Sequence, residues 1–274
     1  FPVPDGDTGT NMSLTIQSVV SNVANLPIGA PGADIRKAIT TGALMGARGN
    51  SGVILSLLFR GIAKELKGCK EADGAAFAAA LQEGVAAAYN AVMKPAEGTI
   101  LTVSRLAAER AVNAAEEHNS VEYVIEQAIA QGEITLAQTT DMNPVLKKAG
   151  VVDAGGKGFL VILQGMLDSL RGVPMPEGDG EGEAKVESKT DYAAIAAEEI
   201  TFTFDTVFIV RKTSPHKGLE AFEAYLNSIG DSLVIGEDDE AFKVHVHTDI
   251  PGAALTEAQK YGTLELAKIE NMRT

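Results

Sequence analysis

The sequence is poor in aromatic residues, cysteine and positive charge. It has no tryptophan, and aromatic residues make up 5% of its 274 residues. Its single cysteine, Cys69, excludes an intrachain disulfide and suits a reducing compartment, so we expect a cytoplasmic protein. No apolar run reaches about 18 residues, so no membrane span is expected. The formal net charge is −14, and a nucleic-acid partner is not expected, because phosphate backbones need a basic surface.

Apolar residues make up 45% of the chain, and its length leaves room for two domains. Up to about residue 172 the apolar positions recur at three- and four-residue spacing, which predicts amphipathic helices. We expect residues 1–172 to form an all-α domain, a barrel or bundle of antiparallel helices, with no strand before residue 200. The predicted helices span 13–25, 35–46, 51–66, 75–91, 100–117, 121–139 and 158–170.

The composition changes after this helical part. Residues 173–191 carry prolines, glycines and repeated acids with little to bury, which is typical of a linker. Residues 192–274 are then expected to form a small α+β domain. Its predicted strands span 201–210, 232–235 and 241–247, and its predicted helices span 218–229 and 253–261.

Two acids, Asp5 and Asp7, lie in the loop "PVPDGDTGTNM" ahead of the first predicted helix. A calcium-binding EF-hand would need an oxygen ligand, a glycine and a glutamate at positions that here hold Gly9, Thr10 and Ile16. Two carboxylates on a tight loop do supply the oxygen ligands that Mg²⁺ prefers. The loop therefore predicts a magnesium site.

The same loop has a second interpretation that needs no metal. Thr10 or Asn11 could cap a helix that begins at Ser13, and the nearby acids would favour the helix dipole. Alternatively, Thr8, Thr10 and Asn11 could meet phosphate oxygens together with the free N–H groups of the helix start. The residues alone leave both interpretations open.

Glycine-rich junctions recur at other predicted helix ends. In "GARGNSGVILS", the residues Asn50, Ser51 and Gly52 begin a helix and form a plausible anion cradle, although the segment is not a Walker A motif. Residues 97–103 and 143–159 are further polar, glycine-containing junctions. Because the ends of antiparallel helices can converge on one rim of a bundle, we expect these junctions to share a site.

A pair of histidines marks the second domain. His245 and His247 lie two residues apart in a predicted strand, so both point to the same face. They could be half-exposed polar residues without a special role. They could also offer nitrogen ligands to a zinc-like metal.

These motifs, in this order, resemble the catalytic subunit of bacterial fatty acid kinase. The first domain is similar to DhaL, the nucleotide-binding subunit of dihydroxyacetone kinase. The stretches that carry the resemblance are "PVPDGDTGTNM", "GARGNSGVILS", "GTILTV" and "NPVLKKAGVVDAGGKGF", and "KVHVHTDIPG" with "IENMR" extends it through the second domain. The resemblance implies an α-helical barrel that holds Mg²⁺ and ATP at one rim.

The resemblance also implies roles for individual residues. Asp5 and Asp7 match the acids that hold magnesium against the ATP phosphates, which makes them the predicted catalytic and metal-binding residues. In the second domain a family cysteine would complete a zinc site with the two histidines, and Asp205 stands in its place here; an Asp with two His residues is still a zinc-binding set. The positions implied to bind the nucleotide are Thr8, Thr10, Asn11, Asn50, Ser51, Gly52, Thr99, Asp153 and Gly155.

The implied activity is transfer of the γ-phosphoryl group of ATP to the carboxylate of a fatty acid, which gives an acyl phosphate for phospholipid metabolism. The fatty acid would be presented by a separate carrier protein of the DegV type. A further family ligand would lie upstream of Phe1 and a third domain beyond the end of this chain. Two alternatives stay open: a dihydroxyacetone-kinase-like enzyme with another acceptor, and a non-catalytic nucleotide-binding module, which would fit inactivity of this fragment alone. The oligomeric state also stays open, a homodimer included.

Overall fold

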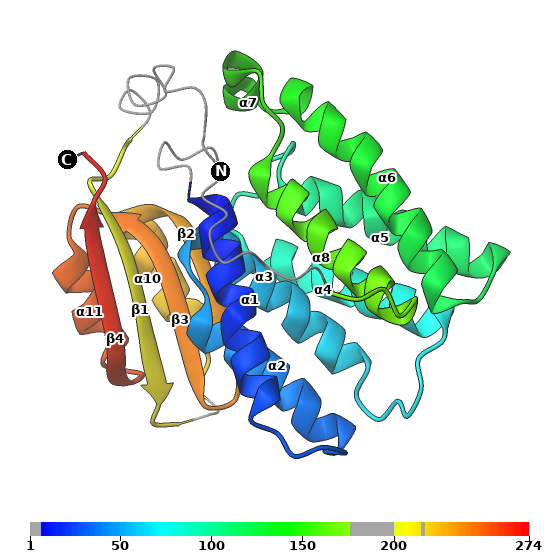
Figure 1. Cartoon of the computed structure of the whole chain (residues 1–274). Coiled ribbons are helices and arrows are strands. Elements are labelled where there is room, and N and C mark those ends of the chain that lie inside the picture. The colour runs from blue at the N-terminus through cyan, green and yellow to red at the C-terminus, as the bar shows by residue number, and fades with distance from the viewer. Residues whose placement is uncertain (1–6, 176–199, 215–216, 274) are drawn as a thin grey trace.

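The computed structural model describes residues 7–175, 200–214 and 217–273. The first domain is entirely helical in its regular structure, as the sequence predicts. Figure 1 shows its helices packed side by side, from blue at α1 to green at α8. They are α1 (Thr8–Ala24), α2 (Gly32–Gly46), α3 (Gly49–Glu65), α4 (Gly74–Ala91), α5 (Ile100–Glu117), α6 (Val121–Met142), α7 (Pro144–Ala149) and α8 (Ala154–Leu170).

Small residues allow the helices of this domain to approach closely. Helix α3 packs against α1, α2 and α4, and it is continuously buried from Gly52 to Leu58. A Cβ atom at Gly61 of α3 would lie 2.5 Å from the Cα atom of Gly84 on α4, so these two helices touch backbone to backbone. The core between these helices consists mainly of alanine, leucine and valine side chains. Side chains of this size fill the narrow space between closely packed helices.

The second domain is a four-stranded antiparallel sheet with two helices on one face. The strand order is β2-β3-β1-β4. Phe208, Phe222 and Phe242 are fully buried between the sheet and these helices. The elements are β1 (Phe204–Lys212), α10 (Glu220–Ile229), β2 (Gly230–Glu237), β3 (Ala241–Thr248), α11 (Pro251–Ala258) and β4 (Gly262–Asn271).

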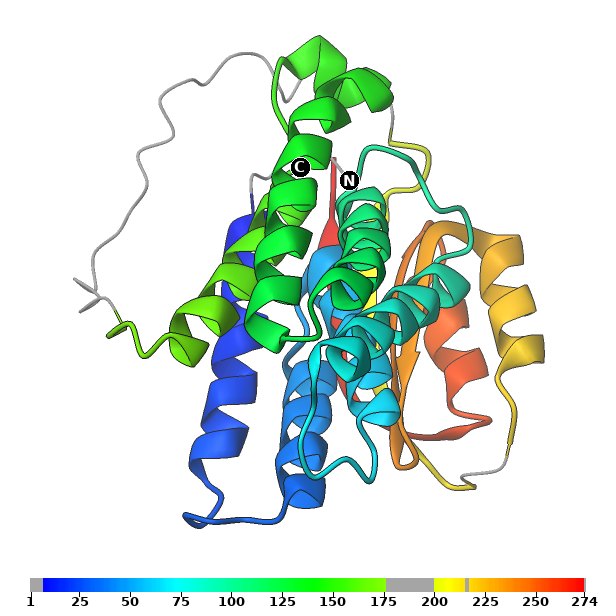
Figure 2. The same cartoon turned by 90° about the vertical axis from the view of Figure 1, so that its right-hand side faces the viewer.

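The sheet lies between α10 and α11 on one side and the helical domain on the other (Figures 1 and 2). Strand β2 contacts α3, and an antiparallel bridge joins Val234 of β2 to Val92 just after α4. Gly236 of β2 lies against Leu44 and Ser56, because a Cβ atom there would be 3.1 Å from Leu44 Cδ1 and 3.5 Å from Ser56 Oγ. The two domains therefore share a packed interface.

The structure differs from the sequence-based expectations in four elements. Helix α1 begins at Thr8 and not at Ser13, so Thr10 and Asn11 lie inside its first turn and neither is its N-cap. The short helix α7 and strand β4 were not predicted. Strand β4 is an edge strand whose side chains are mostly exposed, so it lacks the apolar signal of a buried strand. The bridge at Val92 also places one strand-like pairing before residue 200.

Most of the predicted linker, residues 176–191, lies outside the described residues, so the boundaries at 172 and 192 stay predictions. Within the described part of the chain, the helices lack the combination of length and apolar character needed to cross a bilayer.

Candidate active site

The starts of four helices meet at one cavity. Helices α1, α3, α5 and α8 all contribute residues from their first turn or N-cap. The cavity has a volume of about 60 Å³. A helix start carries unpaired N–H groups and the positive end of the helix dipole, so several starts around one cavity favour an anion there. The lining residues are Asp7, Thr8, Asn11, Gly49, Asn50, Ser51, Ile54, Ile100, Asp153, Gly155, Asp205, His245, His247 and Met272.

The first carboxylate of this cavity is Asp7, at the N-cap position of α1. Its side chain does not cap the helix; Oδ2 instead accepts a hydrogen bond of 2.8 Å from Asn11 Nδ2. Asn11 thus holds the carboxylate and leaves Oδ1 for a ligand in the cavity. Asp5, the other predicted magnesium ligand, lies outside the described residues.

The α2–α3 loop contributes the glycine turn that the sequence predicts. Gly49 has a φ of 57°, and a Cβ atom there would lie 2.6 Å from Asn11 Nδ2, so both conformation and space require glycine. No side chain caps α3 at Arg48. Asn50 Oδ1 is buried and has no hydrogen-bond partner among the described residues. A buried oxygen without a hydrogen-bond partner lowers the stability of the protein. This indicates that a bound ligand interacts with Asn50 Oδ1.

The second carboxylate of the helical domain is Asp153, the N-cap of α8, which is 4% exposed. Its Oδ2 accepts a hydrogen bond of 2.7 Å from the Gly156 N–H, and its own N–H donates to Thr139 Oγ1 at 3.0 Å. Burial raises the pKa of Asp153, although the hydrogen bond from Gly156 opposes this. Asp153 therefore fixes the start of α8 at the edge of the cavity.

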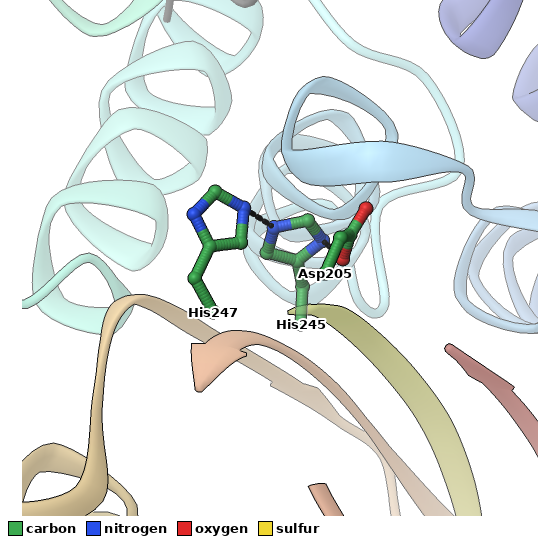
Figure 3. Close-up of side chains that lie close together, drawn as sticks. All are labelled: Asp205, His245 and His247. Carbon is green, nitrogen blue, oxygen red and sulfur yellow. Dashed lines mark hydrogen bonds and ion pairs between the residues drawn. The ribbon is translucent and has the colours of Figure 1, made fainter. Parts of the chain in front are cut away.

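The histidines of β3 enter the same cavity from the opposite domain. Figure 3 shows His245, His247 and Asp205 on one face of the sheet, close together. The two Nε2 atoms are 3.2 Å apart, and His245 Nδ1 lies 3.5 Å from Asp205 Oδ1. Two imidazole nitrogens bound to one tetrahedral zinc ion lie about 3.4 Å apart, given bonds of about 2.0–2.1 Å. The Nε2 separation therefore fits a shared metal ion.

A further carboxylate, Asp231 of β2, lies directly opposite His247 in the sheet register, and its Oδ1 is 3.6 Å from His247 Nδ1. Each histidine therefore has a carboxylate near Nδ1, an arrangement that leaves Nε2 to bind a metal. Burial lowers the pKa of both histidines, and the charges of His247 and Lys243 lower that of His245 further. Both rings are accordingly neutral and able to act as ligands at neutral pH.

Comparison with known proteins identifies the family. The family model described as the DAK2 domain matches residues 2–168. The chain belongs to the DAK2 domain family. A second model, which describes a FakA-like middle domain of the fatty acid kinase type, matches residues 201–274, so the DAK2 domain is followed by a FakA-like middle domain. This places the chain in a kinase-type family whose first domain binds nucleotide.

Several bacterial relatives align over the whole chain. It is 43% identical over 281 residues to Protein YloV of Bacillus subtilis, 44% identical over 278 residues to Uncharacterized protein SH1689 of Staphylococcus haemolyticus, and 41% identical over 281 residues to Uncharacterized protein SAUSA300_1119 of Staphylococcus aureus. In each case all of this chain aligns with 50% of the relative. The chain therefore spans about half the length of these curated relatives.

Three residues that the resemblance assigns to the nucleotide do not line the cavity of the DAK2 domain. Thr10 is exposed on the first turn of α1. Gly52 is buried where α1 and α3 meet, and a Cβ atom there would be 2.5 Å from Thr15 Oγ1. Thr99 is the N-cap of α5 and accepts a hydrogen bond from the Leu101 N–H. The position of Gly52 therefore indicates a packing role, and that of Thr99 indicates a capping role.

Sequence reasoning also missed Met272, which lines the cavity, and two residues close to the histidines, Lys243 and Asp231. Lys243 lies on the same face of β3 as the histidines, and its alternation with them in "KVHVH" was an available signal. Asp231 and Met272 had no such signal, because strand register and the end of β4 bring them to the site.

Proposed function

We propose that this chain is the ATP-binding part of a phosphotransferase that phosphorylates the carboxylate of a fatty acid. The product is an acyl phosphate, and the fatty acid is presented by a separate carrier protein. The observation that carries the proposal is the shared cavity, in which the helix starts of the DAK2 domain face the histidines of the FakA-like middle domain. In this proposal the nucleotide phosphates and the acceptor carboxylate would meet in one cavity.

The DAK2 side of the cavity fits a nucleotide phosphate with magnesium. Asp7, together with Asp5 upstream, would hold Mg²⁺, which neutralises phosphate charge. Asn50 Oδ1, buried without a partner among the described residues, fits a further polar contact to the bound group. The N–H groups at the start of α3 would bind phosphate oxygens, since no side chain caps them.

The middle-domain side fits a zinc ion. His245 and His247 would supply Nε2 ligands, and Asp205 would either bind the ion or orient His245 through Nδ1. When bound, the ion would supply a positive charge for the acceptor carboxylate. His245 is buried, at 2% exposed, whereas Asp205 and His247 are partly exposed.

The phosphoryl transfer needs no general base. A carboxylate oxygen of the fatty acid forms a bond to the γ-phosphorus of ATP, while the bond from that phosphorus to the β–γ bridging oxygen breaks and ADP leaves. A fatty acid is ionised at neutral pH, so no proton has to be removed. The work of this chain is to position the reactants and stabilise charge on the transferring oxygens, which the converging helix starts favour.

The test is a phosphotransfer assay on the full-length protein with Mg²⁺, ATP and a fatty acid bound to its carrier protein. We expect ADP release coupled to an acyl phosphate, which hydroxylamine traps as a hydroxamate. Dihydroxyacetone as the acceptor serves as the control. Phosphorylation of dihydroxyacetone would favour the alternative acceptor, and nucleotide binding without transfer to either acceptor would favour a non-catalytic module.

A further inference from the structure

Lys243 is an unusual residue of β3, because its side chain is almost fully buried. It is 1% exposed, less than any other lysine or arginine among the described residues. No carboxylate of the described part of the chain forms an ion pair with it. Lysine is rarely buried without a partner, so its contacts need an explanation.

The partners of Lys243 lie in the other domain. Its Nζ donates hydrogen bonds to the backbone carbonyls of Met45, at 3.3 Å, and of Ala47. These carbonyls are at the C-terminal end of α2, where Ala47 is the C-cap. A protonated amino group at a helix C-terminus is favoured by the helix dipole and satisfies carbonyls that the helix leaves unpaired. Burial, and then the nearby charge of Arg48, lower the pKa of Lys243 to about 7, and both the charged and the neutral amine can donate these hydrogen bonds.

The sheet is shaped to let the end of α2 reach Lys243. Gly236 is the register partner of Lys243 on β2, and it lacks the side chain that would press on Leu44 near the end of α2. The approach of α2 and the burial of the ammonium group are therefore parts of one contact.

This contact joins the two halves of the cavity. Ala47 is followed directly by Arg48 and then by Gly49, Asn50 and Ser51, the first turn of α3, which lines the cavity. On the other side, Lys243 is two residues before His245 on the same face of the same strand. One side chain thus links the start of α3 in the DAK2 domain to the histidine strand of the middle domain.

We propose that Lys243 is a positioning residue, which holds the histidine strand at a fixed distance from the first turn of α3, Gly49–Ser51. Its catalytic consequence rests on the phosphotransfer proposed above. The hydrogen bonds from Lys243 to the end of α2 fix the position of the residues that follow α2 and line the cavity. Strand β3 carries both Lys243 and the histidines, so it fixes the position of the histidines relative to these residues. Loss of the ammonium group lets the two domains move relative to each other while each domain keeps its own fold.

The experiment compares Lys243→Met with a matched control, Lys212→Met. Lys212 is also a largely buried lysine of this sheet, but its Nζ bonds to Glu237 Oε2 and the Asp238 carbonyl within the same domain. Spin labels are placed at Cys69, which is exposed in the helical domain, and at a cysteine that replaces the exposed Lys268 of β4. Their distance distribution reports how firmly the domains are held together.

We expect Lys243→Met to broaden this distribution and Lys212→Met to leave it narrow. Lys243→Arg keeps a charged donor and should restore much of the narrow distribution. Gly236→Val, which places a side chain between Leu44 and the sheet while keeping the lysine, should also broaden the distribution. It is the second test if Lys243→Met does not fold. Equal distributions in wild type and Lys243→Met, or equal broadening in Lys212→Met, would overturn the proposal.

The same variants are then assayed for phosphotransfer. We expect Lys243→Met to lower kcat by about tenfold to a hundredfold with little change in KM for ATP, because small displacements of reacting groups have effects of this size. An unchanged kcat alongside a broadened distribution would also overturn the positioning role. If the wild-type protein transfers no phosphoryl group, the proposed function fails, and the distance measurement still decides whether Lys243 holds the domains together.

Discussion

At the scale of single residues, Asp7 is the predicted magnesium ligand that lines the described cavity. We expect Asp7→Asn to weaken magnesium-dependent ATP binding by at least about tenfold, because it removes a negative oxygen ligand while preserving the side-chain shape. Calorimetry with a non-hydrolysable ATP analogue measures the affinity. Asp34→Asn is the matched control, since Asp34 lies in the first turn of α2 and outside the cavity. Equal affinity for wild type and Asp7→Asn would remove Asp7 from the site.

The sequence located much of this cavity at the residue scale. Asp7 and Asn50 were found because an acid and an amide stand beside glycines near predicted helix starts, whereas Asp153 was found through the family resemblance. The structure brings all three together. Thr99 shares that pattern but caps its own helix, since the same polar residues that bind ligands also cap helices. The local sequence therefore cannot distinguish a residue that binds a ligand from one that caps a helix.

At the scale of elements, close helix packing makes a stability prediction. We expect Gly61→Ala to destabilise the protein by about 1–3 kcal/mol, because the added methyl group would collide with the backbone of α4. Gly165→Ala on α8 is the control: no atom lies within 4 Å of its added Cβ, and alanine should leave stability unchanged or raise it by about 0.5–1 kcal/mol. Denaturant unfolding compares the two variants. The packing explanation would be contradicted if Gly165→Ala lowered the free energy of unfolding and Gly61→Ala did not.

The histidine strand makes a prediction about metal content. We expect protein purified without chelator to contain zinc, and the His245→Ala/His247→Ala double variant to lose it. Elemental analysis decides this, and protein that stays free of zinc after zinc is added would end the metal hypothesis.

The same strand predicts how zinc binding depends on pH. Protons compete with zinc for imidazole nitrogen. The pKa values of both histidines are lowered in the folded protein, so their rings stay neutral as pH falls to the ordinary histidine pKa of 6.5. We therefore expect occupancy to persist at that pH and to fall only under more acidic conditions. Titration of bound zinc against pH measures this, and release that begins above 6.5 would be the contrary result.

Elements differ in how well the sequence foretold them. The long helices α3, α5 and α6 were found with little error, since their buried faces repeat with the helical period. Strand β4 was missed because an exposed edge strand carries no run of buried residues. The contact between sheet and helices could not be predicted at all, since it depends on how two separately patterned domains meet.

At the scale of the whole molecule, composition and packing together predict the outcome of proteolysis. Residues 173–191 have few apolar side chains to offset the cost of ordering their backbone, so we expect the first cuts there. The two products should still elute together in size-exclusion chromatography, because β2 and β3 pack against α3 and α2. A first cut within α3 would mean that the domain boundary is misplaced, and products that elute separately would show that the interface is weak.

The shared cavity also constrains how these proteins can evolve. A change at Asn50 alters the surroundings of His245 in the other domain, and a change on β3 alters the loop that faces it. Natural selection must then favour paired exchanges, in which a substitution in one domain is followed by a compensating one in its neighbour. Grafting a middle domain from a distant relative onto this DAK2 domain should therefore fail more often than either domain's own stability would suggest.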